Sequence, residues 1–312
     1  MVAGGLAVTF AVLLLTWANP LPVGEPGFWI IVRSRATAVG TIALVATCQA
    51  LATVLFHTAT RNRILTPSIL GFDALYTLMQ TALVFVFGMA ATQVEGVGKI
   101  IVQSLAMIAF ASVLYGWLFS GTRQNLHVLL LVGVVLGVGF GSVSTFLQRM
   151  LTPSEFDLLS ARLFGSIGRG NPDVLPWAGL IVAVIGVLAW RQRRTLDVLA
   201  LGRDTATNLG LRYRRQVVVL LVVVATLVSI STTMVGPMTF FGFLVATMTY
   251  QFVHVDDHGR TLPMAVLVAV ATLLGASFVL QHIFYAAGLV MIIIEFVGGL
   301  AFLIVILKKG LR

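Results

Sequence analysis

Charged residues are scarce in this chain of 312 residues. Asp, Glu, Lys and Arg together make up 10% of it, and the mean hydropathy is +1.02. A soluble domain carries about 25% charged residues. A chain this poor in charge cannot cover a globular surface with polar groups, so lipid must be its main solvent. Because lipid offers no hydrogen bonds to the backbone, we expect an all-α, polytopic transmembrane helical bundle.

Cysteine and the common catalytic motifs are also missing. The single cysteine, Cys48, lies in an apolar stretch, which excludes a disulfide framework and a cysteine-based metal site. No G-x-x-x-x-G-K-[ST] or H-E-x-x-H motif occurs, and the histidines do not cluster. Ser166 with a distant histidine could form an intramembrane serine hydrolase, but such pairs arise often by chance. We therefore expect no enzyme activity and no cofactor in this chain.

Hydropathy divides the chain into about ten membrane spans. No soluble segment stands out at either end, so we expect one membrane domain over residues 1–312. Residues 2–18 are interpreted as a membrane helix, because they lack the basic start and the cleavage site of a signal peptide. The spans run roughly over residues 2–18, 33–57, 69–90, 99–119, 126–147, 175–190, 213–235, 238–255, 262–281 and 288–307.

The distribution of basic residues predicts the orientation. An even number of spans places both termini on one side of the membrane. If that side is the cytoplasm, fourteen of the twenty Lys and Arg lie inside and six lie outside, which agrees with the positive-inside bias. We expect a multi-pass protein of a bacterial cytoplasmic membrane with cytoplasmic termini. The polar loop at 191–215 then faces the cytoplasm, and the loop at 148–176 faces outward.

The loop at 191–215 is the longest polar interruption of the chain. Seven arginines lie in it, around a weak helical pattern of apolar residues. Such a short helix-turn-helix at a membrane surface is typical of a docking surface for another protein. An ordinary cytoplasmic loop that obeys the charge bias is the alternative. The candidate docking residues are Leu196, Asp197, Leu199, Gly202, Arg203, Asp204, Ala206, Leu209 and Gly210.

Small residues gather in the fifth span. Gly133, Gly137 and Gly141 recur at intervals of four, near one helix face, and Ser144 follows them. This spacing favours close approach of a neighbouring backbone. Plain helix packing is one interpretation, and a helix bordering a translocation path is the other.

Two acidic residues lie within predicted spans. Thr66 and Pro67 are typical of a helix start, with Asp73 placed to interact with the positive end of the helix dipole. Glu295 lies within the last span, where an ionisable group is costly and must face the protein interior or a wet cavity. It is either a functional residue or a hydrogen-bonded structural one. Glu295 is the only acid expected near the middle of a span. An ion-coupled carrier is therefore the less favoured transport class.

Three segments stand out as motifs, in the order T-R-N-R-I-L-T-P-S-I-L-G-F-D, G-P-M-T-F-F-G and D-H-G-R-T-L-P. Their sequences and order resemble the signatures R-N-P-L-A-x-P-x-x-L-G, G-x-I-x-F-x-G and D-H-R-x-L-L-P of FecCD-type permeases. These are the membrane subunits of ABC importers for iron-siderophores, haem and cobalamin. The loop from Gly202 to Gly210 resembles the family's coupling helices. Variants within these motifs resemble the branch associated with catecholate-type ferric siderophores.

The resemblance implies partners and roles. It implies two permease subunits, commonly non-identical in that branch, two ATPase subunits that hold ATP and Mg²⁺, and an extracytoplasmic substrate-binding protein. Family arginines that contact the binding protein correspond to Arg35 and, displaced by one residue, to Arg33, while Gln281 stands where a third arginine is expected. The implied function is ATP-driven import of a ferric siderophore. Haem or cobalamin remains the alternative cargo.

Overall fold

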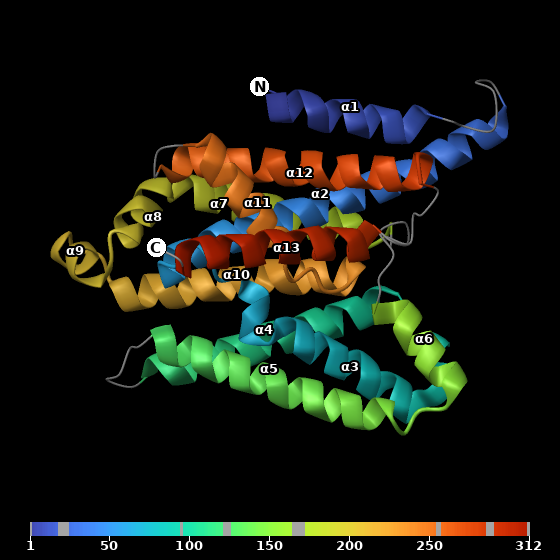
Figure 1. Cartoon of the computed structure of the whole chain (residues 1–312), viewed down its shortest axis with the longest axis horizontal. Coiled ribbons are helices and arrows are strands. Elements are labelled where there is room, and N and C mark those ends of the chain that lie inside the picture. The colour runs from blue at the N-terminus through green and yellow to red at the C-terminus, as the bar shows by residue number, and fades with distance from the viewer. Residues whose placement is uncertain are drawn as a thin grey trace.

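The computed structural model describes residues 2–17, 25–93, 96–120, 126–163, 172–253, 257–284 and 290–310. Within these ranges every regular element is a helix (Figure 1). The elements are α1 (Val2–Thr16), α2 (Pro26–Thr60), η1 (Pro67–Leu70), α3 (Phe72–Phe87), η2 (Gly88–Gln93), α4 (Val97–Ser120), α5 (Leu126–Gln148), α6 (Pro153–Leu163), α7 (Leu175–Arg191), α8 (Arg193–Ala200), α9 (Arg203–Asn208), α10 (Tyr213–Val235), α11 (Phe241–Phe252), α12 (His258–His282) and α13 (Val290–Gly310).

The helices match the predicted spans one by one, although not all have the length of a full span. In the described ranges six helices are long and apolar enough to cross a membrane, or seven if α7 and α8, bent by 65°, form one span. The apolar parts of α1 and α13 are shorter, and α11 has 12 residues. At 1.5 Å per residue α11 is about 18 Å long, roughly half of a bilayer core. The chain is an integral membrane protein of the all-α class.

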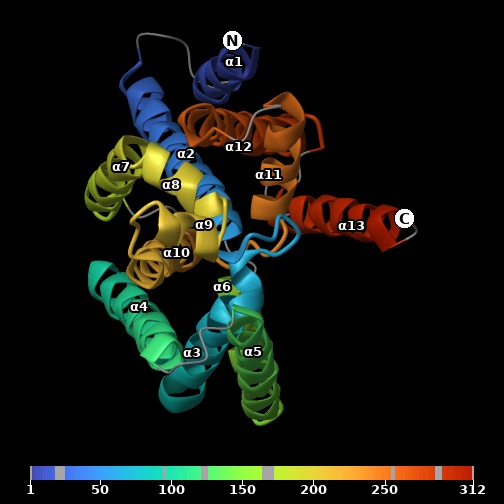
Figure 2. The same cartoon turned by 90° about the vertical axis from the view of Figure 1, so that its left-hand side faces the viewer.

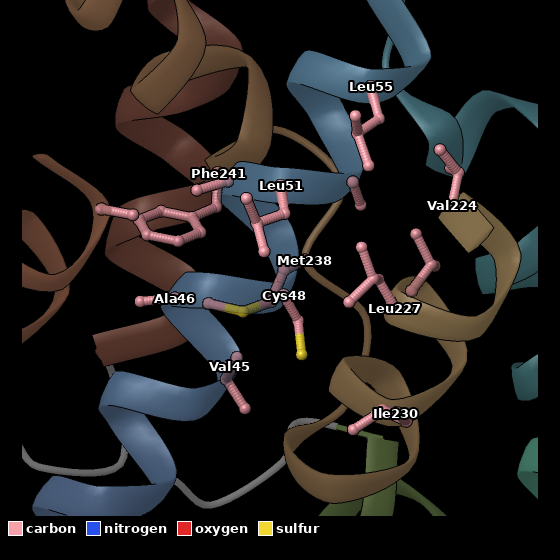
Figure 3. Close-up of a cluster of buried hydrophobic side chains, with 14 of the residues drawn as sticks. Val45, Ala46, Cys48, Leu51, Leu55, Val224, Leu227, Ile230, Met238 and Phe241 are labelled. Carbon is pink, nitrogen blue, oxygen red and sulfur yellow. The ribbon is translucent and has the colours of Figure 1, made fainter. Parts of the chain in front are cut away.

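Helix α2 is the centre of the bundle. It is apolar on all sides and packs against α1, α7, α10, α11 and α12. Figure 3 shows Leu51 and Leu55 of α2 directed toward Leu227 and Val224 of α10, with Phe241 of α11 on another side of α2. We expected α2 to start near residue 33, but it begins at Pro26. Proline suits the first turn of a helix, which explains the earlier start.

Helices α3, α4, α5 and α6 form a second group, which joins the α2 group mainly through the packing of α4 against α10 (Figure 2). Polar side chains connect α3 to α5 inside this group. The Thr81 and Ser144 hydroxyl oxygens lie 2.9 Å apart, and the Gln148 amide donates to both hydroxyls at 3.3 and 3.1 Å. These bonds satisfy polar groups that lipid cannot solvate.

The third predicted span is divided in two. Thr66 and Pro67 begin the 3-10 turn η1, as expected for a helix start, but Gly71 adopts a left-handed conformation and α3 begins only at Phe72. This turn lies against the glycines of α5. A Cβ on Gly133 would stand 2.9 Å from Leu70 Cα, and one on Gly137 would stand 3.2 Å from Gly71 Cα. Because these positions are glycines, the backbone of η1 can approach α5 closely, as the packing interpretation predicts.

The two predicted loops lie at opposite ends of the molecule. In Figure 1, α8 and α9 form one end and α6 lies at the other, while α13 runs toward the α8 end. Helix α6 begins with a capping box: Thr152 N and Thr152 Oγ1 donate to Glu155 Oε2 at 2.9 and 2.8 Å. These two bonds hold the pKa of the Glu155 carboxyl below its usual value.

Replacing Gly133 by alanine should destabilise the protein by about 1–3 kcal/mol, because the new methyl group meets the backbone of Leu70, which cannot move aside cheaply. The measurement is the unfolding midpoint of the purified protein in detergent. Gly139→Ala is the matched control, since nothing lies within 4 Å of that Cβ position on the same helix. Equal midpoints for the two variants would contradict the close approach.

Candidate functional site

The predicted helix-turn-helix is present between α7 and α10. Helix α7 ends at Arg191, and after a bend of 65° the chain forms α8 and then α9. We call residues 191–212 the elbow. Its inner face is buried at Leu196, Leu199 and Ala206. Its outer face is exposed at Arg203, Asp204, Leu209 and Gly210, with Leu209 61% exposed.

The turn between α8 and α9 depends on Gly202. Its φ is +103°, a conformation that favours glycine, and the guanidinium of Arg61 lies directly against it. A Cβ at this position would stand 2.7 Å from Arg61 Nη1. Arg61 itself ends α2 in the left-handed conformation. The last turn of α2 and the elbow are therefore in contact.

Asp197 connects the elbow to α12. Its Oδ1 accepts a hydrogen bond from His258 N at 2.9 Å and lies 2.6 Å from His258 Nδ1. We expected Asp197 to belong to the docking set, but the sequence assigned no role to His258. The Asp257-His258 pair in the family-like motif was the signal that could have drawn attention to it.

Glu295 has a partner that the sequence did not reveal. Both of its carboxylate oxygens accept from Phe240 N, at 3.2 and 3.1 Å. Phe240 is the N-cap residue of α11, so Glu295 satisfies a backbone group at the start of that short helix. Gly298 permits the close approach of α13, because a Cβ there would stand 2.8 Å from Phe240 Cβ.

Asp73 of α3 contacts the same connection between α10 and α11. Thr239 Oγ1 donates to Asp73 Oδ2 at 2.8 Å. Residues 239 and 240 thus bond to α3 through Asp73 and to α13 through Glu295. Each acid therefore accepts a hydrogen bond from the turn between α10 and α11.

The remaining candidates of the fifth span divide into two kinds. Gly133 and Gly137 contact the turn η1. Ser144 is buried, and its hydroxyl is hydrogen-bonded to Thr81 of α3. Gly141 has nothing within 4 Å of its Cβ position and takes no part in that contact. The four residues therefore do not form a single site.

The candidates for binding-protein docking lie far from the elbow. Arg33 is exposed in α2, and Arg35 Nη1 donates to Trp17 O at 2.7 Å. Trp17 contacts Phe278 of α12 edge-on, with ring centroids 6.4 Å apart, and Gln281 follows exposed in the last turn of α12. The start of α2 and the end of α12 are thus brought to one end of the molecule. Arg33 and Arg35 lie within the helix, and not at its opening.

These features describe a helical membrane bundle with an exposed helical elbow at one end and no phosphate-binding motif in its sequence. Comparison with known proteins agrees with this class. The model of the FecCD transport family matches residues 4–308, and the chain belongs to that family.

Several individual relatives are named as petrobactin import permeases. The chain is 42% identical to the petrobactin import system permease protein FatC of Bacillus anthracis over 99% of this chain and 87% of that protein. It is 40% identical to the petrobactin import system permease protein YclO of Bacillus subtilis strain 168, over 88% of each. A second B. anthracis petrobactin permease protein, FatD, is 23% identical over 91% of this chain and 83% of that protein.

The fold has also been seen before. The chain superposes with a TM-score of 0.79 on an inward-facing putative metal-chelate type ABC transporter, at 21% identity over 98% of this chain and 97% of that one. At this identity the match supports the fold alone.

Replacing Glu295 by leucine should lower the stability by about 1–3 kcal/mol, because Phe240 N then has no acceptor in an apolar environment. Glu295→Gln keeps an acceptor oxygen and should lose less. The unfolding midpoint in detergent measures both variants, and Phe296→Leu, at an exposed neighbour, is the control. A leucine variant as stable as the glutamine variant would remove the capping role.

Proposed function

We propose that this chain is the permease subunit of an ATP-driven importer of a ferric siderophore, with petrobactin as the cargo to test first. The elbow carries the proposal. It presents an exposed surface at one end of a bundle whose sequence has no nucleotide motif, which fits energy supplied by a docked ATPase. The names of FatC and YclO support the cargo.

The two other transport hypotheses have less support. Haem or cobalamin import uses the same family fold, but FatC and YclO, both at least 40% identical to this chain, are named as petrobactin permeases. An ion-coupled carrier needs acids free to bind the coupling ion. Here both carboxylate oxygens of Glu295 and Oδ2 of Asp73 accept hydrogen bonds from the protein, which leaves Asp73 Oδ1 as the one oxygen of these two acids without a hydrogen-bond partner among the described residues. Neither observation favours a second function.

A second permease subunit is part of the proposal. B. anthracis has two petrobactin permease proteins among the relatives, and this chain is much more similar to FatC than to FatD. A non-identical partner that resembles FatD is therefore expected. Helix α13 projects from the bundle in Figure 2, and its side chains Phe296, Leu300 and Leu303 are exposed. A partner subunit could cover this apolar face beside the lipid.

The two ends of the molecule then have separate partners. ATPase subunits, which hold ATP and Mg²⁺, dock on the elbow in the cytoplasm. A substrate-binding protein docks outside, near Arg33, Arg35 and Gln281. Exposed ion pairs at such a surface contribute about 0.2–1 kcal/mol each and mainly guide the encounter. The chain itself carries out no bond chemistry; it alternates between two arrangements whose balance the ATPases shift.

Reconstitution tests the cargo and the energy source together. The purified chain, a FatD-like permease, the ATPase and the binding protein are placed in proteoliposomes, and uptake of iron-labelled petrobactin is measured. We expect uptake that requires internal ATP and the ATPase. Haem and cobalamin serve as competitors that should not reduce it. Uptake driven by an ion gradient without the ATPase would overturn the proposal.

Replacing Leu209 by glutamate should reduce import and the transport-linked ATPase rate about tenfold or more, because a charge enters the exposed apolar contact of the elbow. The residue is exposed, so the fold should be unaffected. The measurements are uptake and co-purification of the ATPase. Leu209→Met is the matched control and should behave as wild type. Normal ATPase binding by the glutamate variant would argue against docking at this surface.

A further inference from the structure

One carboxylate oxygen fastens α8 to the start of α12. Asp197 Oδ1 binds both the backbone N–H and the imidazole Nδ1 of His258, the first residue of α12. The free N–H groups at a helix start attract a carboxylate. The contact therefore fixes the position of α8 relative to α12, and it involves a residue of the elbow itself.

The imidazole continues this connection to α2. His258 Nε2 lies 2.7 Å from Thr58 Oγ1 in the last turn of α2, and both residues are buried. Thr58 Oγ1 is also 3.0 Å from Val54 O. A hydroxyl has one hydrogen, so it either donates to His258 or donates to Val54 while accepting from His258. Each arrangement leaves the imidazole bonded to α2.

The space beside this chain of bonds is not filled by side chains. A cavity of about 350 Å³ lies there, lined by residues of α2, α8, α11 and α12, among them Thr58, Asp197, Tyr250 and His258. Apolar packing of Leu196 and Leu199 and these hydrogen bonds together join α8 to its neighbours. The contact of Arg61 with Gly202 is a second link between the end of α2 and the elbow.

We propose that Asp197, His258 and Thr58 form a positioning strut that carries displacement of the elbow directly into α2 and α12. The inference rests on the proposed function, since it assumes that an ATPase moves the elbow. The covalent neighbours of the elbow are α7 and α10, and α7 meets α8 at a 65° bend, where a helix can pivot. The strut bypasses that bend and reaches the central helix of the bundle.

A purely structural role makes a different prediction. If Asp197 and His258 only cap α12, the hydrogen bond between His258 and Thr58 has no importance for transport. Thr58→Val removes that hydrogen bond and leaves the Asp197–His258 contact in place. Thr58→Ser keeps the hydroxyl and is the matched control. His258→Asn provides a second test, because its amide reaches the position of Nδ1 but not that of Nε2.

The measurement is the number of ATP molecules hydrolysed per siderophore imported by the complete reconstituted complex. We expect Thr58→Val and His258→Asn each to raise this ratio by about threefold or more, with Thr58→Ser unchanged. The double variant should be no worse than either single variant, because both remove the same link. Size-exclusion chromatography checks that each complex is assembled.

Wild-type ratios in both Thr58→Val and His258→Asn would overturn the strut while leaving the proposed function standing. Equal effects of serine and valine at position 58 would also overturn it, since the hydroxyl would then not matter. A wild-type complex that imports without ATP would instead overturn the proposed function, and the strut with it. The two failures are therefore distinguishable.

Discussion

The absence of water inside a bilayer determines how the connection between α10 and α11 is built. Every backbone N–H there needs a partner from the protein. Helix α11 is too short to span the membrane, so its first N–H groups begin within the bundle. Glu295 supplies the acceptor for one of them, and Asp73 holds the preceding Thr239. Two acidic residues that are costly on their own thus become structural parts of the turn between α10 and α11.

The same constraint explains the small residues around the other break. The turn η1 interrupts the third span, and its backbone lies against α5 where side chains would block it. Glycines at 133 and 137 make this possible, while their neighbour Gly139 faces open space. Both irregular segments are thus enclosed by protein. Irregular backbone enclosed in this way is compatible with a membrane and is typical of transporters.

Much of this could be predicted from the sequence, because hydropathy and charge act over long stretches. Each predicted span corresponds to a helix, although only six or seven of the described helices are long enough to cross a membrane. The short helices of the elbow were also predicted, since apolar runs and clustered arginines are local signals. The partner of Glu295 could not be predicted, because it is the backbone N–H of Phe240, which leaves no trace in residue type. The Asp197–His258 contact was missed for a related reason: its members lie 61 positions apart. The start of α2 was misplaced because Arg33 and Arg35 looked like residues at a span end.

The length of α2 has a mechanical consequence. Its 35 residues correspond to a rod of about 52 Å, well beyond a hydrocarbon core of about 30 Å. The helix must tilt or extend beyond the hydrocarbon core, and its ends reach water at both surfaces. One tip carries the arginines near Trp17, and the other touches Gly202. When a helix of this length tilts about its middle, its two ends move in opposite directions. A displacement at one membrane surface then produces a displacement at the other within the same helix.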